Sequence, residues 1–217
     1  MAQQLQSITI TAPGFAGINT QDAPLGQEPS FAAIADNCVI DKEGRIAARK
    51  GYDMVSTNGG GVLGSSDGIE SMGEFVANDG DTVFFSAGNN RIFTGTTTLT
   101  DATPGSYTPT ANDWKFVPFN NRMYMFQSGH EPLVYDDAVG SVQAMSAHSA
   151  SAGTPPQGNE AIAAFGRIWT ADIVGDTSTV YWSDLLIGMD WTNGTSGSID
   201  LTRVWPNGYD TVVALAA

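Results

Sequence analysis

The sequence predicts an all-β fold built from short antiparallel strands and tight turns. Glycine is frequent, with 25 of 217 residues, and 10 prolines add further points at which the chain turns. Charged residues make up only 15% of the chain, a low share for long amphipathic helices. From residue 69 onward, apolar stretches of strand length recur in a fixed order, separated by polar turns. Together these observations favour many short strands.

The first thirty residues are predicted to form an extended arm. Their single apolar residues alternate with Pro, Gly and Asn too irregularly for a stable element. Ser30 can serve as a helix N-cap, and apolar residues of the following "FAAIADN" share one face at helical spacing. We therefore expect one short helix near residues 30–37, ending at about Asn37.

A basic β-hairpin is predicted next, with Val39 and Ile40 before its turn and Ile46 and Ala48 after it. Two apolar stretches flank "DKEG", in which Gly44 permits the positive φ angle of a tight turn. The whole chain has 23 acidic and only nine basic side chains, with a net charge of −14. Four of the nine basic residues lie in this hairpin: Lys42, Arg45, Arg49 and Lys50. We take these four as a candidate assembly interface, the alternative being a solvated hairpin that pairs with nearby carboxylates.

The remainder of the chain repeats one order of features: an apolar strand, a turn, a second apolar or aromatic strand, a polar gap and a third strand. In the two clearest copies, Arg122 and Arg167 follow the first turn and are 45 residues apart. Asp81 takes this place in a weaker copy. Repeats of this length with three or four strands are typical of β-propeller blades. The copies span residues 69–95, 113–137 and 159–184.

These patterns divide the chain into an arm, short helix and basic hairpin over 1–68 and propeller-type repeats over 69–217. The final stretch, "DTVVALAA" (210–217), matches the first strand of a repeat and has no second strand after it. An unpaired terminal strand leaves an exposed sheet edge. We therefore expect the last repeat to be incomplete and the chain to be the front part of a longer polypeptide.

Several function classes are disfavoured by the composition. The strong negative charge disfavours a conventional DNA-binding protein, which needs clustered cations for phosphate contacts. No apolar run approaches the length of a membrane-spanning segment, and the N-terminus lacks the pattern of a secretory signal. The single Cys38 cannot form an internal disulfide, and neither His130 nor His148 has metal ligands at suitable spacing. We expect no catalytic site, metal or cofactor.

One stretch, "SDLLIGMDW" (183–191), resembles the aspartate-box turn of sialidase propellers. Its spacing departs from that pattern, because Asp184 directly follows Ser183. In sialidases this turn is a folding device away from the active site. The resemblance therefore supports a propeller and predicts no reaction.

The N-terminal run "GFAGINTQDAPLGQEPSFAAIADNCVIDKEGRIAARKGY" (14–52) carries a second resemblance. It is similar to the N-terminal segment of the tail nozzle proteins of short-tailed bacteriophages, also called tail tubular protein B or, in a related lineage, stabilisation or hub protein. The shared features are a Gly-Ile-polar opening, a Pro-containing arm, an Ala-rich segment ending in Asn, a hairpin with a central Gly and an Arg-x-Gly close. In this sequence they fall at Gly17, Ile18, Asn19, Asn37, Gly44, Arg49 and Gly51.

This resemblance implies a structural virion protein without enzymatic activity or cofactor. Such a protein is made in the host bacterial cytoplasm and forms a hexameric tube below the portal and adaptor of the phage tail, through which the genome is ejected. A propeller-based carbohydrate-binding protein, depolymerase or adhesin is the alternative. That alternative would need aromatic and carboxylate side chains gathered on one propeller face.

Overall fold

A computed structural model describes residues 14, 16–23, 26–28, 30–40, 45–51, 68–88, 90–105, 107, 113–204 and 211–217. Within these ranges every regular element is a β-strand, apart from two single 3-10 turns, η2 (Met145–Ala147) and η3 (Leu201–Arg203). The predicted all-β class is therefore confirmed. Over the same residues, no helix has the length and apolar character required to cross a bilayer.

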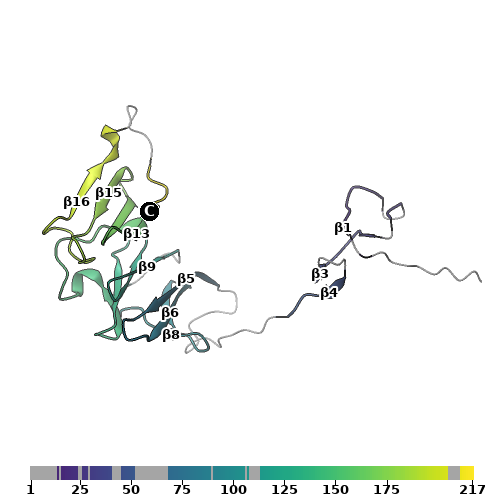
Figure 1. Ribbon diagram of the computed structural model, residues 1–217, viewed down its shortest axis with the longest axis horizontal. Helices are drawn as coiled ribbons and strands as arrows, with labels where there is room; N and C mark the ends of the chain where they lie inside the picture. Colours follow the sequence, from purple (N-terminus) through teal and green to yellow (C-terminus); the bar gives the residue numbers. More distant parts are fainter. Residues whose placement is uncertain are drawn as a thin grey trace, which may run out of the picture. The chain divides into compact units, whose positions relative to one another are not determined.

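The chain divides into two compact units, Met1–Asp53 and Met54–Ala217 (Figure 1). The boundary predicted from the repeats, between residues 68 and 69, remains a prediction. Most of the regular structure and all of the buried core among the described residues belong to the second unit.

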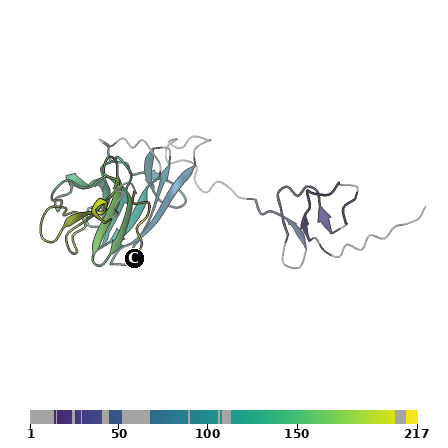
Figure 2. The same ribbon diagram turned by 90° about the horizontal axis from the view of Figure 1, so that it is seen from above.

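The first unit contains two small strand pairs (Figure 2). Strand β1 (Gly17–Ile18) pairs in parallel with β2 (Phe31–Ala32), and β3 (Cys38–Ile40) pairs in antiparallel fashion with β4 (Ile46–Ala48). The second pair is the hairpin predicted from the sequence.

The helix predicted near residues 30–37 is absent, and this prediction was wrong. Phe31 and Ala32 instead form β2, which pairs with Gly17 and Ile18. Asn37 has a φ angle of 54°, which a right-handed helix does not contain. The segment is shorter than the 12–15 residues or so that an isolated helix needs in water, so backbone pairing to a distant segment outweighs its local helical pattern.

The second unit contains three four-stranded antiparallel sheets, in each of which every strand pairs with the next strand of the chain (Figure 1). Sheet 1 consists of β5 (Ile69–Val76), β6 (Thr82–Gly88), β7 (Arg91–Thr94) and β8 (Thr100–Asp101). Sheet 2 consists of β9 (Lys115–Phe119), β10 (Arg122–Phe126), β11 (Leu133–Asp136) and β12 (Ser141–Ala144). Sheet 3 consists of β13 (Gly158–Ala164), β14 (Arg167–Ile173), β15 (Thr179–Trp182) and β16 (Gly197–Asp200).

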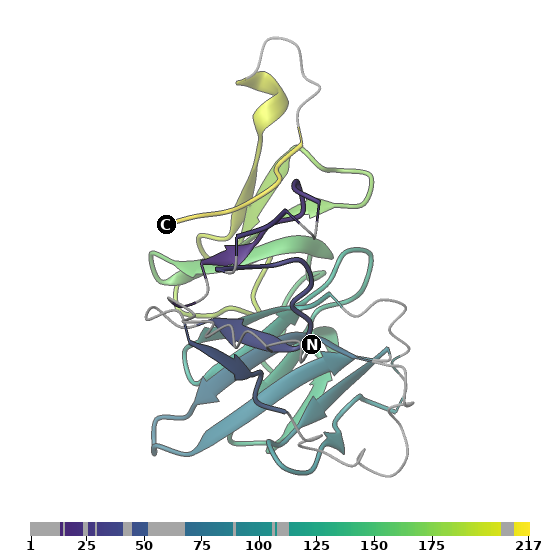
Figure 3. The ribbon, with the colours of Figure 1, turned by 90° about the vertical axis from the view of Figure 1, so that its right-hand side faces the viewer.

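Successive side chains of a strand point to opposite faces of its sheet. In sheet 2 both sets of side chains include buried apolar residues, so each face packs into an apolar cluster. Along β10, Met123 and Met125 pack into a cluster with Phe75 and Phe85 of sheet 1. The alternate residues of β10, Tyr124 and Phe126, pack with Ile168 and Met189 on the side of sheet 3. All of these side chains are at most 1% exposed. The sheets therefore stack face to face, with sheet 2 in the middle (Figure 3).

The first strands of the three sheets lie next to one another in the order β5, β9, β13. Gly73 of β5 faces Phe116 of β9 so closely that a Cβ atom on Gly73 would overlap the phenyl group. Between β9 and β13, Lys115 Nζ lies 3.4 Å from Glu160 Oε1. Each sheet thus presents its first strand to the same side of the stack.

The predicted correspondence between Arg122 and Arg167 is confirmed by strand register. Arg122 pairs with Phe119 across the turn between β9 and β10, and Arg167 pairs with Ala164 across the turn between β13 and β14. Both turns have two residues with positive φ angles, as two-residue type I′ hairpin turns require. The turn residues are Asn120 and Asn121 in sheet 2 and Phe165 and Gly166 in sheet 3.

The described residues 211–217 form no strand but pack against sheet 3. The Val212 N–H donates to the carbonyl oxygen of Thr177 at 2.9 Å. Val212 and Leu215 extend a small apolar cluster that includes Trp169, Ala171 and Val180. In the part of the chain that the structure describes, the three sheets form an open stack and no closed ring of sheets is present.

Candidate assembly interface

Three residue pairs join the two strands of the basic hairpin: Cys38 with Ala48, Val39 with Ala47, and Ile40 with Ile46. One further bond, from the Arg49 N–H to the Asn37 carbonyl oxygen at 2.8 Å, closes its open end. Arg45 precedes the second strand and Arg49 and Lys50 follow it. The fourth candidate, Lys42, lies outside the described residues, as does Gly44.

The three described basic residues of the hairpin are exposed: Arg45, Arg49 and Lys50. They lie within six consecutive positions that contain no acidic residue. Apolar side chains of the same hairpin are also accessible, with Val39 51% and Ile46 40% exposed. The hairpin therefore combines positive charge with aliphatic surface, and its proposed role in assembly remains a prediction.

The rest of the first unit also lacks a core among its described residues. None of them is buried, and two aliphatic side chains are open to solvent, Ile18 at 55% and Ile34 at 78%. Two-stranded pairs are at best marginally stable alone in water. A segment of this kind becomes stable when its apolar side chains are covered by another surface, whether of this chain or of a second one.

The second unit has a large excess of acidic residues. Of the nine Lys and Arg residues only five lie after residue 50, together with most of the 23 acidic residues. Arg91 pairs with Asp101 at 2.7 Å, and Lys115 pairs with Glu160. Arg122 and Arg167 are likewise bonded within their sheets. The second unit thus presents a strongly acidic surface to any basic segment that approaches it.

A buried polar cluster between sheets 2 and 3 was not predicted from the sequence. Arg122 Nε donates to Asp136 Oδ2 at 2.6 Å, and His148 Nε2 lies 3.0 Å from the same oxygen. The Ala150 N–H donates to His148 Nδ1, so Nδ1 carries no proton and Nε2 is the donor toward Asp136. The third partner of Asp136 is the Ala138 N–H. The Asp136 carboxylate of β11 thus connects this strand to β10 and to the segment after η2.

Asp136 is only 4% exposed, and burial by itself opposes its ionisation. The hydrogen bonds from Arg122 and the Ala138 N–H outweigh this effect, and the net result is a lowered pKa for Asp136. Both oxygens of the Asp136 carboxylate accept hydrogen bonds from groups of the protein itself. We interpret the cluster as structural.

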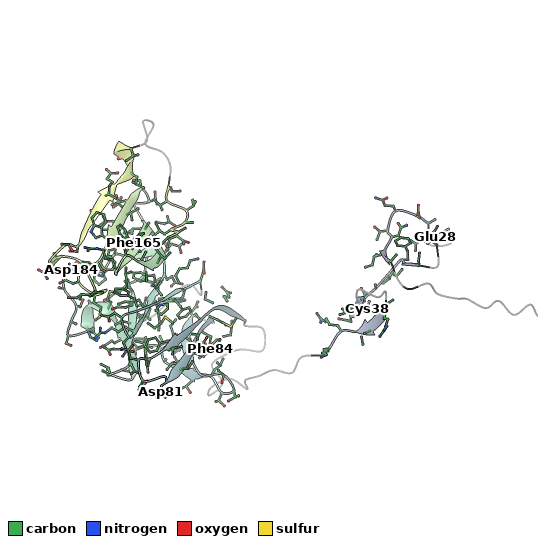
Figure 4. All side chains as sticks on the ribbon, viewed as in Figure 1. Glu28, Cys38, Asp81, Phe84, Phe165 and Asp184 are labelled. Carbon is green, nitrogen blue, oxygen red and sulfur yellow. The ribbon has the colours of Figure 1, made fainter. Side chains whose placement is uncertain are left out.

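The stretch that resembles an aspartate box, 183–191, forms a loop after β15 that is held by hydrogen bonds to neighbouring segments. Ser183 is fully buried and its Oγ accepts from the Ile168 N–H at 3.0 Å. Asp184 Oδ1 accepts from the Thr195 N–H at 2.8 Å and from its hydroxyl at 2.9 Å, and these bonds lower the pKa of Asp184. Figure 4 marks Asp184 at the margin of the second unit. These bonds hold the loop and support the interpretation of this stretch as a folding device.

Within the described ranges, no group of three or more His, Cys, Asp or Glu side chains is arranged to hold a metal ion. His130 lies beside the rings of Tyr107 and Trp114, which is the environment of a core aromatic residue. Cys38 is a free, half-buried thiol in β3.

No model of a known protein family matches the sequence, and a search of curated proteins found no significant match.

Proposed function

We propose that this chain is a structural protein of the short tail of a bacteriophage, assembling as a hexameric nozzle below the portal and adaptor. In this proposal the second unit is the rigid body of each subunit and the first unit makes contacts between subunits. The chain is assigned no catalysis and no cofactor. Its place is the virion, after synthesis in the host cytoplasm.

One observation carries the proposal: the first unit has no buried side chain among its described residues, yet it exposes both aliphatic and basic groups. A monomeric protein gains little from such a segment, because its ordering cost is not offset by burial. In a ring, each subunit contacts its neighbour through two different patches. The basic and aliphatic hairpin strand around residues 45–50 and the acidic second unit are complementary patches of this kind.

The stacked sheets of the second unit support a propeller-like platform. Propeller blades are four-stranded antiparallel sheets that follow one another in the chain. The three sheets here have that topology, and their first strands β5, β9 and β13 are neighbours. Closure of a ring of blades is part of the proposal, with the remaining blades supplied from outside the residues described.

The net charge of −14 suits a channel for DNA. Phosphates bind proteins through clustered cations, and a surface with few free cations offers no such sites. Carboxylates lining a passage would repel the DNA backbone and keep the genome mobile during ejection.

The test is the assembly state of the full chain. Sedimentation velocity over a range of protein concentrations should reveal a hexamer, and negative-stain images should show rings with a central opening. A protein that stays monomeric at all concentrations, or forms trimers as a tail fibre or adhesin would, contradicts the proposal.

A further inference from the structure

A groove at one end of sheet 3 is not used by the proposed assembly function. It has a volume of about 350 Å³ and lies between the segment that leads into β13 and the strands β14 and β15. This volume is at the lower end of the range found for small-molecule sites, about 300–1,000 Å³. Its lining residues are Thr154, Pro155, Pro156, Gln157, Ile173, Tyr181 and Trp191.

Two aromatic rings of the groove are fixed by hydrogen bonds that point into the protein. The Tyr181 hydroxyl donates to Asp176 Oδ2 at 2.7 Å, and a second bond from Thr179 at 2.6 Å holds Asp176 in place. The bond to Asp176 also raises the pKa of Tyr181. Trp191 Nε1 lies 3.4 Å from Met145 Sδ. With their polar atoms engaged inside, both rings offer apolar surface to the groove.

The walls of the groove are tied together by backbone bonds. The Trp191 N–H donates to the Ala152 carbonyl oxygen at 2.9 Å, and the Ala152 N–H donates to the Met189 carbonyl oxygen at 3.1 Å. The Gln157 carbonyl oxygen accepts from the Gly129 N–H at 3.4 Å. Asp190 accepts from the N–H groups of the two residues after Trp191. The site is therefore formed without a ligand.

Polar groups at the rim complete the lining. Thr154 and Gln157 are exposed, and within the described part of the chain neither side chain has a hydrogen-bond partner. An amide supplies two donors and an acceptor, and a hydroxyl supplies one donor and accepts as well. No Lys, Arg or His belongs to the lining, whereas the carboxylates Asp176 and Asp190 lie directly behind it.

We propose that this groove binds a neutral saccharide, with a pyranose ring lying against Trp191 and Tyr181 and its hydroxyls bonded to Gln157 and Thr154. The apolar C–H face of a sugar is complementary to a fixed aromatic ring, and its hydroxyls require amide and hydroxyl partners at the rim. The absence of cations from the lining and the carboxylates behind it exclude phosphorylated or acidic sugars by repulsion.

A proline-rich peptide is the competing ligand for a groove lined by Trp, Tyr and Pro. Its backbone carbonyls need donors within the groove, and the indole N–H and phenol O–H are the usual polar handles of such rings. Here those of Trp191 and Tyr181 are directed to Met145 and Asp176 instead. The donors that remain, on Gln157 and Thr154, lie at the rim, where they suit the peripheral hydroxyls of a sugar ring, so the lining favours the saccharide.

The test is isothermal titration of the full chain with maltohexaose, cellohexaose and N-acetylchitohexaose, and with decaproline as the competing peptide. We expect binding of at least one hexasaccharide in the millimolar range or tighter. Q157A, which changes an exposed side chain, should weaken that binding at least threefold, and W191L should weaken it at least tenfold. Trp182→Phe serves as the matched control, since it changes another half-buried tryptophan of sheet 3 outside the groove, and its affinity should match the parent.

The affinity of a variant is compared with that of the parent protein only if both have the same midpoint of thermal unfolding. If W191L fails this check, Q157A alone decides. Lack of binding by all three hexasaccharides overturns the proposal, and so does saccharide binding that Q157A leaves unchanged. Decaproline binding in place of saccharide binding would assign the groove to peptides.

Discussion

Arg122 and Arg167 hold equivalent positions in consecutive sheets and make equivalent connections. Each is the first residue of the second strand of its sheet. Arg122 donates to Asp136, the last residue of β11, at 2.6 Å. Arg167 donates to the carbonyl oxygen of Ser183, which directly follows β15, at 2.8 Å. In both sheets the arginine fastens the start of the second strand to the end of the third.

Replacing Asp136 by alanine should destabilise the second unit by about 1.5–3 kcal/mol, the range for lost hydrogen bonds to charged groups. The substitution leaves Arg122 and His148 without their shared acceptor in a site that is 4% exposed. Urea unfolding would measure the difference. Asp137→Ala, at the adjacent half-buried position, is the control and should change stability by much less. Equal effects of the two substitutions would show that the buried cluster adds nothing specific.

The pH dependence of stability should contain a contribution from Asp136. Its folded-state pKa lies below the usual value of 3.8, so the unfolded chain binds the proton more readily. The stabilisation is complete above the unfolded pKa and is lost as the pH falls through the folded pKa. Unfolding free energies measured from about pH 6 down to pH 2 should therefore decrease at the acidic end. The decrease should be smaller in D136N, and an identical profile in that variant would contradict the assignment.

Gly73→Ala should destabilise the contact between β5 and β9 by about 1–3 kcal/mol, the usual cost of overpacking. A methyl group at this position overlaps the Phe116 side chain. Gly105→Ala is the matched control, because a Cβ atom there meets nothing within 4 Å. In a F116G background, which also removes the Phe116 Cβ atom nearest to the added methyl group, the cost of G73A should largely disappear, and chemical denaturation of the four variants can test this.

Neutralising the described cations of the hairpin should shift the assembly toward monomers. In the triple variant R45Q/R49Q/K50Q, attraction to an acidic neighbour is lost, at about 0.2–1 kcal/mol for each exposed pair. High salt should act in the same direction on the parent protein. The control, T82E/T96E/T97E, lowers the net charge by the same amount at exposed positions of the second unit. Sedimentation profiles of the triple variant that match the parent at every salt concentration would leave the hairpin as a solvated element.

Deleting residues 1–53 should leave the second unit folded, because its core clusters involve only residues after position 53. The thermal midpoint and the near-ultraviolet circular dichroism of the remaining chain should match those of the second unit in the full protein. Sedimentation should show that the higher assembly is lost. A truncated protein that still assembles in the same way would place the contacts between subunits elsewhere.

The sequence was a good guide to the sheets because their pattern is local. Alternating apolar residues, paired turn residues and the repeated Arg122 and Arg167 all reflect pairing between strands that are neighbours in the chain. The basic hairpin was predicted for the same reason. The helix near residues 30–37 was mispredicted because β2 pairs with Gly17 and Ile18, and local spacing carries no information about that distant partner.

The polar sites were harder to predict because they depend on contacts between elements. The repeated Arg after the first turn was visible, yet the contact of His148 with Asp136 requires the segment after η2 to fold back. The groove beside Trp191 likewise joins three separate segments. No spacing along the chain identifies such a combination.

The strict neighbour-to-neighbour pairing of the three sheets also bears on how the protein is made. Every antiparallel ladder in the second unit joins strands that are adjacent in the chain, so no sheet has to wait for a strand synthesised much later. Short loops close quickly, and proteins rich in local contacts fold faster than those that depend on distant pairings. Each sheet can therefore form as it leaves the ribosome and cover the apolar face of the one before it. A nascent chain that buries its surfaces in this sequential way exposes little for aggregation while many copies accumulate.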